Sequence, residues 1–140
     1  MATFISRRRI RFGDVDRAGI AYYPRYFHWY HVAFEEWFDE VIGVPYRVLI
    51  EERNIGFPTV AIEARHTAPI RFGDDAAIEV SVRKVGRTSA RIRFRVSNET
   101  TGKAAAEAVV TLVCVHMDTF RPVRIPAALR KAFLPGKGKR

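Results

Sequence analysis

The sequence has a single cysteine, Cys114, and no apolar run long enough to cross a bilayer. One cysteine excludes an internal disulfide framework and favours a reducing compartment. A transmembrane helix would need about 18 consecutive apolar residues, and none of that length occurs. The basic run Arg7–Arg9 is not followed by the apolar stretch of a secretory signal. From these absences we expect a cytoplasmic protein without internal disulfides.

Acidic residues are also scarce, with 15 Asp and Glu against 24 Lys and Arg, which gives a net charge of +9. Such an excess suits an anionic partner, which could be a nucleic acid, an anionic membrane surface or a phosphorylated ligand. No zinc-finger spacing and no basic helix are present, so no nucleic-acid-binding motif is visible. We expect neither nucleic acid nor membrane as the partner. The basic end of the chain, 137–140, is expected to be a solvated tail.

What the chain does contain is a long amphipathic stretch near its start. Because it has 140 residues, 48% of them apolar, we expect one domain over 1–140. Apolar side chains recur at helical spacing from Phe27 to Val41, and Pro24 suits a first helical turn. Gly43 supplies a stop. The sequence therefore predicts a long N-terminal helix with one buried face.

The rest of the chain alternates apolar and polar residues between tight turns. Strands are predicted over 3–12, 58–66, around 78–82 and 92–96, and over 104–117, where the long apolar run indicates a central strand. Turn signals lie at 73–75, 86–88 and 98–102. We expect a short helical or irregular piece over 45–53 and a short helix over 126–134. One helix followed by a run of strands predicts an α+β fold, in which an antiparallel sheet packs on the helix.

Two carboxylates before the long helix carry the clearest chemical signal. Asp14 and Asp16 lie in an expected turn, which Gly19 lets close tightly because glycine tolerates positive φ. The first N–H groups of the helix have no intrahelical partners and carry partial positive charge. Free N–H donors can hold an oxyanion, and a nearby carboxylate can attack a carbonyl or act as a base. An aspartate before a helix can also simply form a cap or an Asx-turn, and we expect that role for Asp14.

The same stretch carries a family resemblance. The motif Gly13-Asp14-Val15-Asp16-x-x-Gly19-Ile20-x-Tyr22-Tyr23-Pro24-x-Tyr26, followed by an aromatic-rich helix, resembles the 4-hydroxybenzoyl-CoA thioesterase family of the hotdog fold. Weaker matches follow in the family's order at Ile55-Gly56-x-Pro58, Ile70-x-Phe72-Gly73-Asp74 and Gly86-Arg87-Thr88-Ser89, so the resemblance covers nearly the whole chain. It implies a curved antiparallel sheet wrapped around the long helix. It also implies dimers with two sites at the subunit interface, often paired into tetramers. The implied substrates are acyl-CoA thioesters, cleaved to a free acid and CoA without metal or cofactor.

The resemblance also implies roles for single residues. Asp16 matches the catalytic aspartate, as nucleophile or general base, and Tyr23 matches the start of the helix that polarises the thioester carbonyl. Gly19 would let the turn close and line the carbonyl site. The substrate-binding residues implied are Tyr22, Pro24 and Tyr26 near that site, and Arg87, Thr88 and Ser89 at the CoA phosphates, to which Arg is suited. Because the related Tol–Pal-associated thioesterases have histidine in place of Tyr23, the chain resembles the aryl-CoA branch more closely.

Other side chains permit other chemistry. His28, His31 and Glu35 stand at helical spacing and could bind a metal, but no fourth ligand is obvious, and a solvated or interface face is the ordinary explanation. Cys114 and His116 could form a nucleophile pair. Their apolar neighbours instead favour an inert buried thiol.

Two further patterns also have two explanations. The alternating Arg91, Arg93 and Arg95 could bind phosphates or RNA, whereas an exposed strand face is the default. Trp29 and Tyr30 could line an acyl pocket, or belong to the core or a dimer contact.

The expected function is hydrolysis of an aromatic or short acyl-CoA, and two other classes of function stay open. One is a non-catalytic hotdog subunit that binds acyl-CoA or a protein partner, which would have no need of the Asp16 carboxylate. The other is an RNA-binding basic domain, whose affinity would fall steeply with salt.

Overall fold

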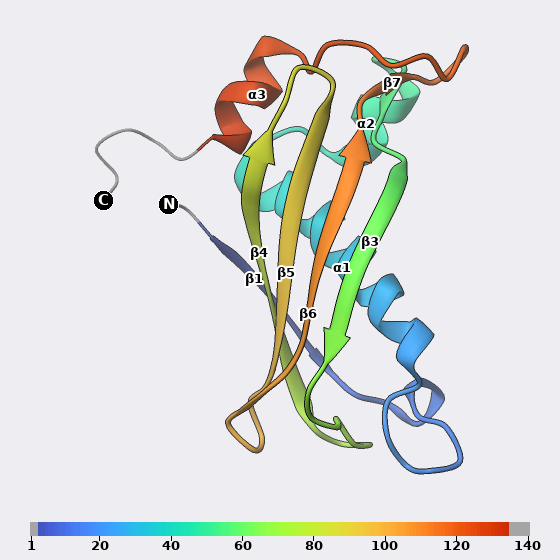
Figure 1. The fold of residues 1–140 in the computed structure, drawn as a ribbon, viewed down its shortest axis with the longest axis vertical. Coiled ribbons are helices and arrows are strands. Elements are labelled where there is room, and N and C mark those ends of the chain that lie inside the picture. The colour runs from blue at the N-terminus through green and yellow to red at the C-terminus, as the bar shows by residue number, and fades with distance from the viewer. Residues whose placement is uncertain (1–2, 135–140) are drawn as a thin grey trace.

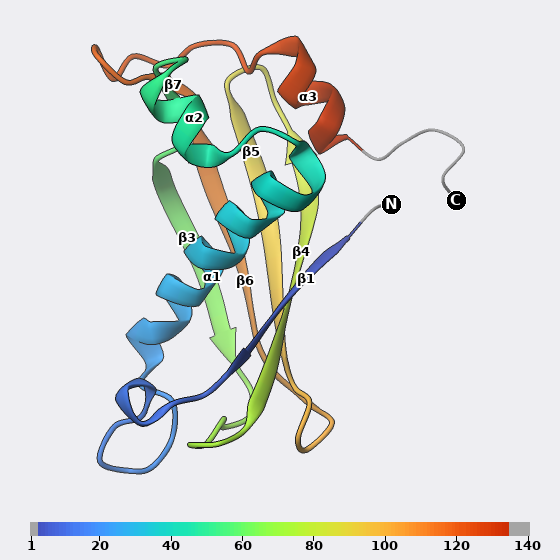
Figure 2. The same cartoon turned by 180° about the vertical axis from the view of Figure 1, so that it is seen from behind.

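The computed structural model describes residues 3–134, so the basic tail at 137–140 lies outside the described residues. A long helix lies across one face of a twisted, five-stranded antiparallel sheet in this part of the chain (Figures 1 and 2). The elements run β1 (Phe4–Arg9), a 3-10 turn (Phe12–Asp14), α1 (Tyr23–Trp37), a π-helical extension (Phe38–Ile42), α2 (Tyr46–Glu51), β2 (Ile55–Gly56), β3 (Thr59–His66), β4 (Asp75–Val85), β5 (Ser89–Asn98), β6 (Lys103–Val113), β7 (Val115–His116) and α3 (Ala127–Phe133). The α+β fold expected from the sequence is confirmed.

The main sheet has the strand order β1-β4-β5-β6-β3, and each neighbouring pair is antiparallel. β2 and β7 form a separate two-stranded sheet. The order leaves β1 and β3 at the two edges. All eight residues of β3 are exposed, which distinguishes this strand from the largely buried β4, β5 and β6.

The predicted long helix is confirmed, and its residues explain its bounds. Pro24 stands in the first turn, where its missing N–H is no loss. After Trp37 the helix continues as one π-helical stretch to Ile42, and Gly43 ends it with φ of +90°. The buried face of α1 meets the inward-pointing residues of the sheet, which include Ile78, Val80, Val82, Ile92, Phe94, Val96, Ala106, Ala108, Val110 and Leu112.

Two predicted strands differ from the observed ones. The strand expected over 3–12 ends at Arg9, because the Asp14 carboxylate accepts the Arg11 N–H at 2.8 Å and draws the chain into the 3-10 turn. The strand expected over 104–117 is split at Cys114 into β6 and β7. Beyond that residue the backbone leaves the main sheet, since Val115 pairs with Gly56 and the Cys114 carbonyl accepts the Val123 N–H at 2.8 Å.

The other predicted elements are confirmed with small shifts in their bounds. The strand predicted from residue 58 is β3, the short helix predicted over 126–134 is α3, and the piece over 45–53, expected to be helical or irregular, contains the helix α2. Among the helices of the described residues, none is long and apolar enough to cross a bilayer.

Candidate active site

The loop between Asp14 and Tyr22 is folded tightly against the start of α1. Val15 and Ala21 form an antiparallel bridge, and Tyr22 N–H donates to the Asp14 carbonyl at 2.8 Å. Inside this loop Gly19 N–H donates to the Asp16 carbonyl at 2.9 Å, with a φ of +82° at Gly19. The positive φ explains why glycine is used at this turn.

The two aspartates of the loop have opposite environments. Asp14 is 3% exposed, and its carboxylate accepts the Arg11 N–H at 2.8 Å and the Arg25 guanidinium at 3.1 Å. Asp16 is exposed, and its Oδ1 accepts the Ala18 N–H at 2.8 Å in an Asx-turn. Its other oxygen accepts no hydrogen bond from the described part of the chain. Asp14 thus has the structural role expected of it, whereas Asp16 presents a carboxylate to solvent.

The start of α1 lacks the usual side-chain cap. The residue before the helix, Tyr22, makes no capping hydrogen bond, and no acidic residue stands in the first turn. Tyr23 N–H donates to no group within residues 3–134, while Arg25 N–H donates to Tyr22 at 2.8 Å. An unpaired N–H at the positive end of a helix is a ready donor for an oxyanion. The Tyr23 side chain is 62% exposed beside it.

A shallow hollow of about 340 Å³ opens at this helix start. It is lined by Ile20, Ala21, Tyr23, Tyr26, His66, Thr67, Ala68, Pro69 and Ile70. Tyr26 is buried, which raises the pKa of its hydroxyl, and its ring lies 4.6 Å from that of His66. Tyr22 is exposed and Pro24 half-buried. The predicted residues from 16 to 26 therefore surround one helix end, and the structure adds His66 from β3, which the sequence did not single out.

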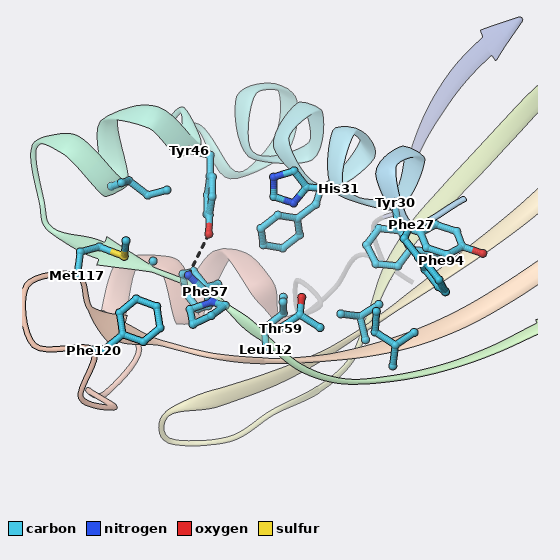
Figure 3. A pocket seen from close by; sticks show the side chains of 16 residues that line it. Phe27, Tyr30, His31, Tyr46, Phe57, Thr59, Phe94, Leu112, Met117 and Phe120 are labelled. Atoms are coloured by element: carbon cyan, nitrogen blue, oxygen red, sulfur yellow. Dashed lines mark hydrogen bonds between the residues drawn. The ribbon is translucent and has the colours of Figure 1, made fainter. Parts of the chain in front are cut away.

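A second hollow, also of about 340 Å³, is apolar and lies between α1 and the inner face of the sheet (Figure 3). Its lining includes Phe27, Tyr30, His31, Phe34, Tyr46, Ile50, Phe57, Thr59, Ile62, Phe94, Val110, Leu112, Met117 and Phe120. Tyr30 is buried with its ring stacked on Phe94 at 5.0 Å, and burial raises the pKa of its hydroxyl. Of the two aromatic residues left open by the sequence, Tyr30 lines this pocket and Trp29 belongs to the core.

The predicted phosphate-binding turn, Arg87–Ser89, is held by backbone hydrogen bonds and lies far from Asp16. Arg87 is exposed, and Thr88 and Ser89 are half-buried. The carbonyl of Arg87 accepts Ile125 N–H at 2.9 Å and that of Thr88 accepts Cys114 N–H at 2.6 Å, which ties the turn to the segment before α3. The Arg87 side chain is therefore presented from a fixed backbone.

Within one chain this turn and Asp16 lie at opposite ends of the sheet (Figure 1). The Asp16 loop is bridged through Ile20 to Arg71, just before β4, and Arg87 follows the far end of β4. An eleven-residue strand separates its ends by about 33 Å. One chain alone therefore does not bring the predicted catalytic and phosphate-binding residues together.

The alternative chemical sites find little support in the geometry. His31 and Glu35 pair at 2.8 Å on an exposed helix face, and residues 3–134 contain no group of three or more side chains placed to hold a metal ion. Burial raises the pKa of the Cys114 thiol to about 11, so little of it is thiolate near neutral pH. The ring Nδ1 of His116 accepts the backbone N–H of Asp118 at 3.3 Å.

The arginines that alternate along β5 form ion pairs with acidic residues on neighbouring strands. Arg93 meets Glu107 at 3.0 Å and Arg95 meets Glu79 at 3.9 Å. The pKa of Glu107 is lowered by its hydrogen bond from Arg93. This sheet face is thus an exposed, charge-paired surface rather than a purely basic one, which favours the default explanation over phosphate or RNA binding.

Comparison with protein families gives one match over most of the chain. A family model described as the thioesterase-like superfamily matches residues 10–133. That span includes the Asp16 loop, α1, α3 and every strand of the main sheet except β1.

Individual proteins agree with that match. The chain is 27% identical to a 1,4-dihydroxy-2-naphthoyl-CoA hydrolase of Prochlorococcus marinus, over 91% of this chain and 86% of that one. It is 34% identical to the 4-hydroxybenzoyl-CoA thioesterase of Pseudomonas sp. strain CBS-3 over 69% of each chain. The solved structure of that enzyme matches with a TM-score of 0.85 at 29% identity, covering 93% of this chain and 98% of that one. A gentisyl-coenzyme A thioesterase, BH1999, matches with a TM-score of 0.83 at 30% identity, covering 94% and 100%.

Proposed function

Because the chain belongs to the thioesterase-like superfamily and is an acyl-CoA thioester hydrolase of the hotdog fold, we propose that it hydrolyses an aromatic or short acyl-CoA to the free acid and CoA. The observation that carries this proposal is the uncapped start of α1. There the Tyr23 N–H, which has no acceptor among the described residues, lies beside a tight loop that presents the Asp16 carboxylate.

In the proposed reaction the thioester carbonyl oxygen is held at the start of α1. Tyr23 N–H donates to it and stabilises the oxyanion, a contribution of about a hundredfold or more in rate for one such donor. Asp16 either attacks the carbonyl carbon or removes a proton from the attacking water. In the first route the C–S bond breaks, CoA leaves as a thiolate and a mixed anhydride with Asp16 remains, which water hydrolyses to the free acid and the Asp16 carboxylate, the released proton going to the thiolate. In the second route the C–S bond breaks after water has added, and the proton that Asp16 took from the water passes to the leaving thiolate. Gly19 keeps the loop closed so that Asp16 faces the helix start.

We place the acyl group of the substrate in the apolar pocket along α1. Tyr23 and Phe27 are one helical turn apart, about 6 Å. A carbonyl at Tyr23 thus directs an attached aromatic ring toward Phe27 and Tyr30, and the Tyr22, Pro24 and Tyr26 side chains flank the path. Aromatic walls suit an aromatic acyl group, because offset and edge contacts between rings add to the hydrophobic effect. The three relatives named above act on aromatic acyl-CoA thioesters, by their names, which agrees with this choice.

The phosphates of CoA are proposed to bind the Arg87–Ser89 turn of a second copy of the chain. Since β3 is an exposed edge, two copies can pair antiparallel along it around a two-fold axis. The strands of the second copy then run the opposite way, and its Arg87 turn comes to the end of the assembly that holds Asp16 of the first copy. A homodimer of this kind has two shared sites, and pairing of two dimers gives a homotetramer.

Charge favours β3 over β1 as the pairing edge. β1 carries Arg7, Arg8 and Arg9 in succession, and like charges oppose the pairing of an edge strand with its own copy. β3 carries Glu63 and Arg65, whose opposite charges are compatible with antiparallel pairing, and the exposed apolar residues Val60 and Ile62.

A cytoplasmic location is part of the proposal. The chain has one cysteine, and in the structure that residue, Cys114, is a buried free thiol. Free thiols persist in compartments that keep proteins reduced.

The first experiment is thiol release from a panel of benzoyl-, 4-hydroxybenzoyl-, phenylacetyl-, acetyl- and hexanoyl-CoA. The proposal predicts hydrolysis of at least one member, with the aromatic ones preferred. Binding of CoA without hydrolysis of any member would instead indicate a non-catalytic acyl-CoA-binding subunit. Binding of RNA that weakens steeply with salt would indicate the nucleic-acid alternative.

A further inference from the structure

The apolar pocket along α1 has more room than one aromatic ring needs. Its volume is about 340 Å³. A dry apolar cavity of roughly 150 Å³ already holds benzene. Figure 3 shows Phe27 and Phe94 at one end of the pocket and Met117 and Phe120 at the other. The pocket is therefore elongated, with space beyond the ring-binding part.

The direction of the pocket fits an acyl group that enters from the helix start. Phe27 is one turn beyond Tyr23, and Phe34 is about 10 Å further along the helix axis. Both phenylalanines line the pocket. A group attached to a carbonyl at Tyr23 reaches Phe27 first and the Met117–Phe120 end last. That far end is thus where the tip of a long acyl group would lie.

The chemistry of the far end favours hydrocarbon over the pantetheine arm of CoA. Its lining includes Ile50, Phe57, Met117 and Phe120. The hydroxyl of Tyr46, a polar group near this end, accepts the Phe57 N–H at 2.9 Å (Figure 3). Pantetheine carries two amides, and burying amides without partners is unfavourable. A hydrocarbon chain has no such requirement.

Phe120 closes this end in an unusual backbone conformation. Its φ is +59°, in the left-handed region that L-residues with large side chains avoid. Phe120 N–H donates to His116 at 2.7 Å, and His116 N–H donates to Arg121 at 3.0 Å, which holds the turn. The ring is 59% exposed, so one side faces solvent while the other lines the pocket. A strained residue whose ring covers the end of a cavity is a candidate for function.

We propose that the far end of the pocket takes the tip of an elongated apolar acyl group and that contact of this tip with Phe120 makes affinity rise with the length of the group. This inference rests on the proposed function for the place of the thioester at Tyr23. It extends the substrate class from single-ring and short acyl groups to longer apolar ones that reach Phe120.

The test uses S-benzyl-, S-butyl-, S-octyl- and S-dodecyl-CoA thioethers, which bind without being cleaved. Dissociation constants are measured for the wild type and Phe120→Gly, which removes the ring and suits the positive φ. We expect equal affinities for the benzyl and butyl ligands and a loss for Phe120→Gly that grows with length, to about tenfold for dodecyl. No change at any length, or a gain for the longest ligands, would overturn the proposal. An equal loss for every ligand and for CoA itself would assign Phe120 to the CoA moiety and would also overturn it.

Asn54→Gly is the matched control. Asn54 also has a positive φ, of 57°, and its carbonyl accepts the Met117 N–H at 2.8 Å, but its side chain does not line the pocket. We expect an unchanged length profile for this variant. Because the thioethers report binding alone, an absence of hydrolysis in the panel above would contradict the proposed function without deciding the role of Phe120.

Discussion

Asp14 and Asp16 show how much one residue's surroundings decide its role. The two carboxylates are two positions apart, yet Asp14 is buried and held by Arg25, whereas Asp16 is exposed and one of its oxygens accepts no hydrogen bond from residues 3–134. A fully engaged carboxylate stabilises the loop, and a partly free one can react. The motif could be predicted to matter from the sequence, and the geometry separates the buried Asp14 carboxylate from the exposed Asp16 carboxylate, to which the proposed function assigns the chemistry.

Asp14→Ala is therefore predicted to destabilise the protein. It removes the acceptor of the Arg11 N–H and the partner of Arg25, and breaking such charged hydrogen bonds costs about 2 kcal/mol. The measurement is the free energy of unfolding in urea. Asp16→Asn is the control, because asparagine can still accept the Ala18 N–H, and we expect it to stay within about 0.5 kcal/mol of the wild type. Equal destabilisation by both changes would contradict this division of roles.

At the scale of elements, the spacing of apolar residues along the sequence predicts those helices and strands whose bounds depend on neighbouring residues. The spacing of apolar residues and the stop at Gly43 predicted α1, and alternation predicted β4 and β5. The run over 104–117 reads as one strand because its apolar character continues through Cys114. The break there comes from the pairing of Val115 with Gly56 and from the Val123 N–H at the Cys114 carbonyl, partners that lie outside the run and leave no mark on it.

The candidate site likewise has a part that the sequence could predict and a part that depends on the fold. Asp16, Gly19 and Tyr23 belong to one contiguous motif, so the sequence could predict that they lie in one loop and helix start. The apolar pocket draws on α1, β3, β6 and the turn at Phe120, and only the fold brings these segments together. His66 and Phe120 carried no signal in the sequence beyond their residue types. The distance of the Arg87 turn from Asp16 likewise follows from the strand order and could not be predicted from the motif.

At the scale of the whole molecule, the separation of about 33 Å between the ends of β4 decides how a CoA site can be built. In the proposed dimer, Asp16 of one copy and Arg87 of the other serve the same substrate. A site shared between two chains therefore predicts how mixed dimers of two variants behave.

We predict that Asp16→Asn and Arg87→Glu chains complement each other. Each variant alone should hydrolyse acyl-CoA poorly, the second through a raised KM because its turn repels the CoA phosphates. In a mixed dimer one of the two sites receives both intact residues, so each mixed dimer should recover about half of the wild-type rate. The mixture is made from differently tagged chains that are unfolded and refolded together. If both residues of a site came from one chain, every site would keep a defect and no activity would return.

The central claim, that the Asp16 carboxylate performs the hydrolysis at the start of α1, is tested most directly by kcat for Asp16→Asn on the best substrate of the panel. Asparagine keeps the size and the bond to Ala18 but removes the charge, so we predict a loss of at least about a hundredfold in kcat. Asp39→Asn, at an exposed aspartate beyond the far end of α1, should retain wild-type kcat. An Asp16→Asn enzyme as active as the wild type would contradict the assignment.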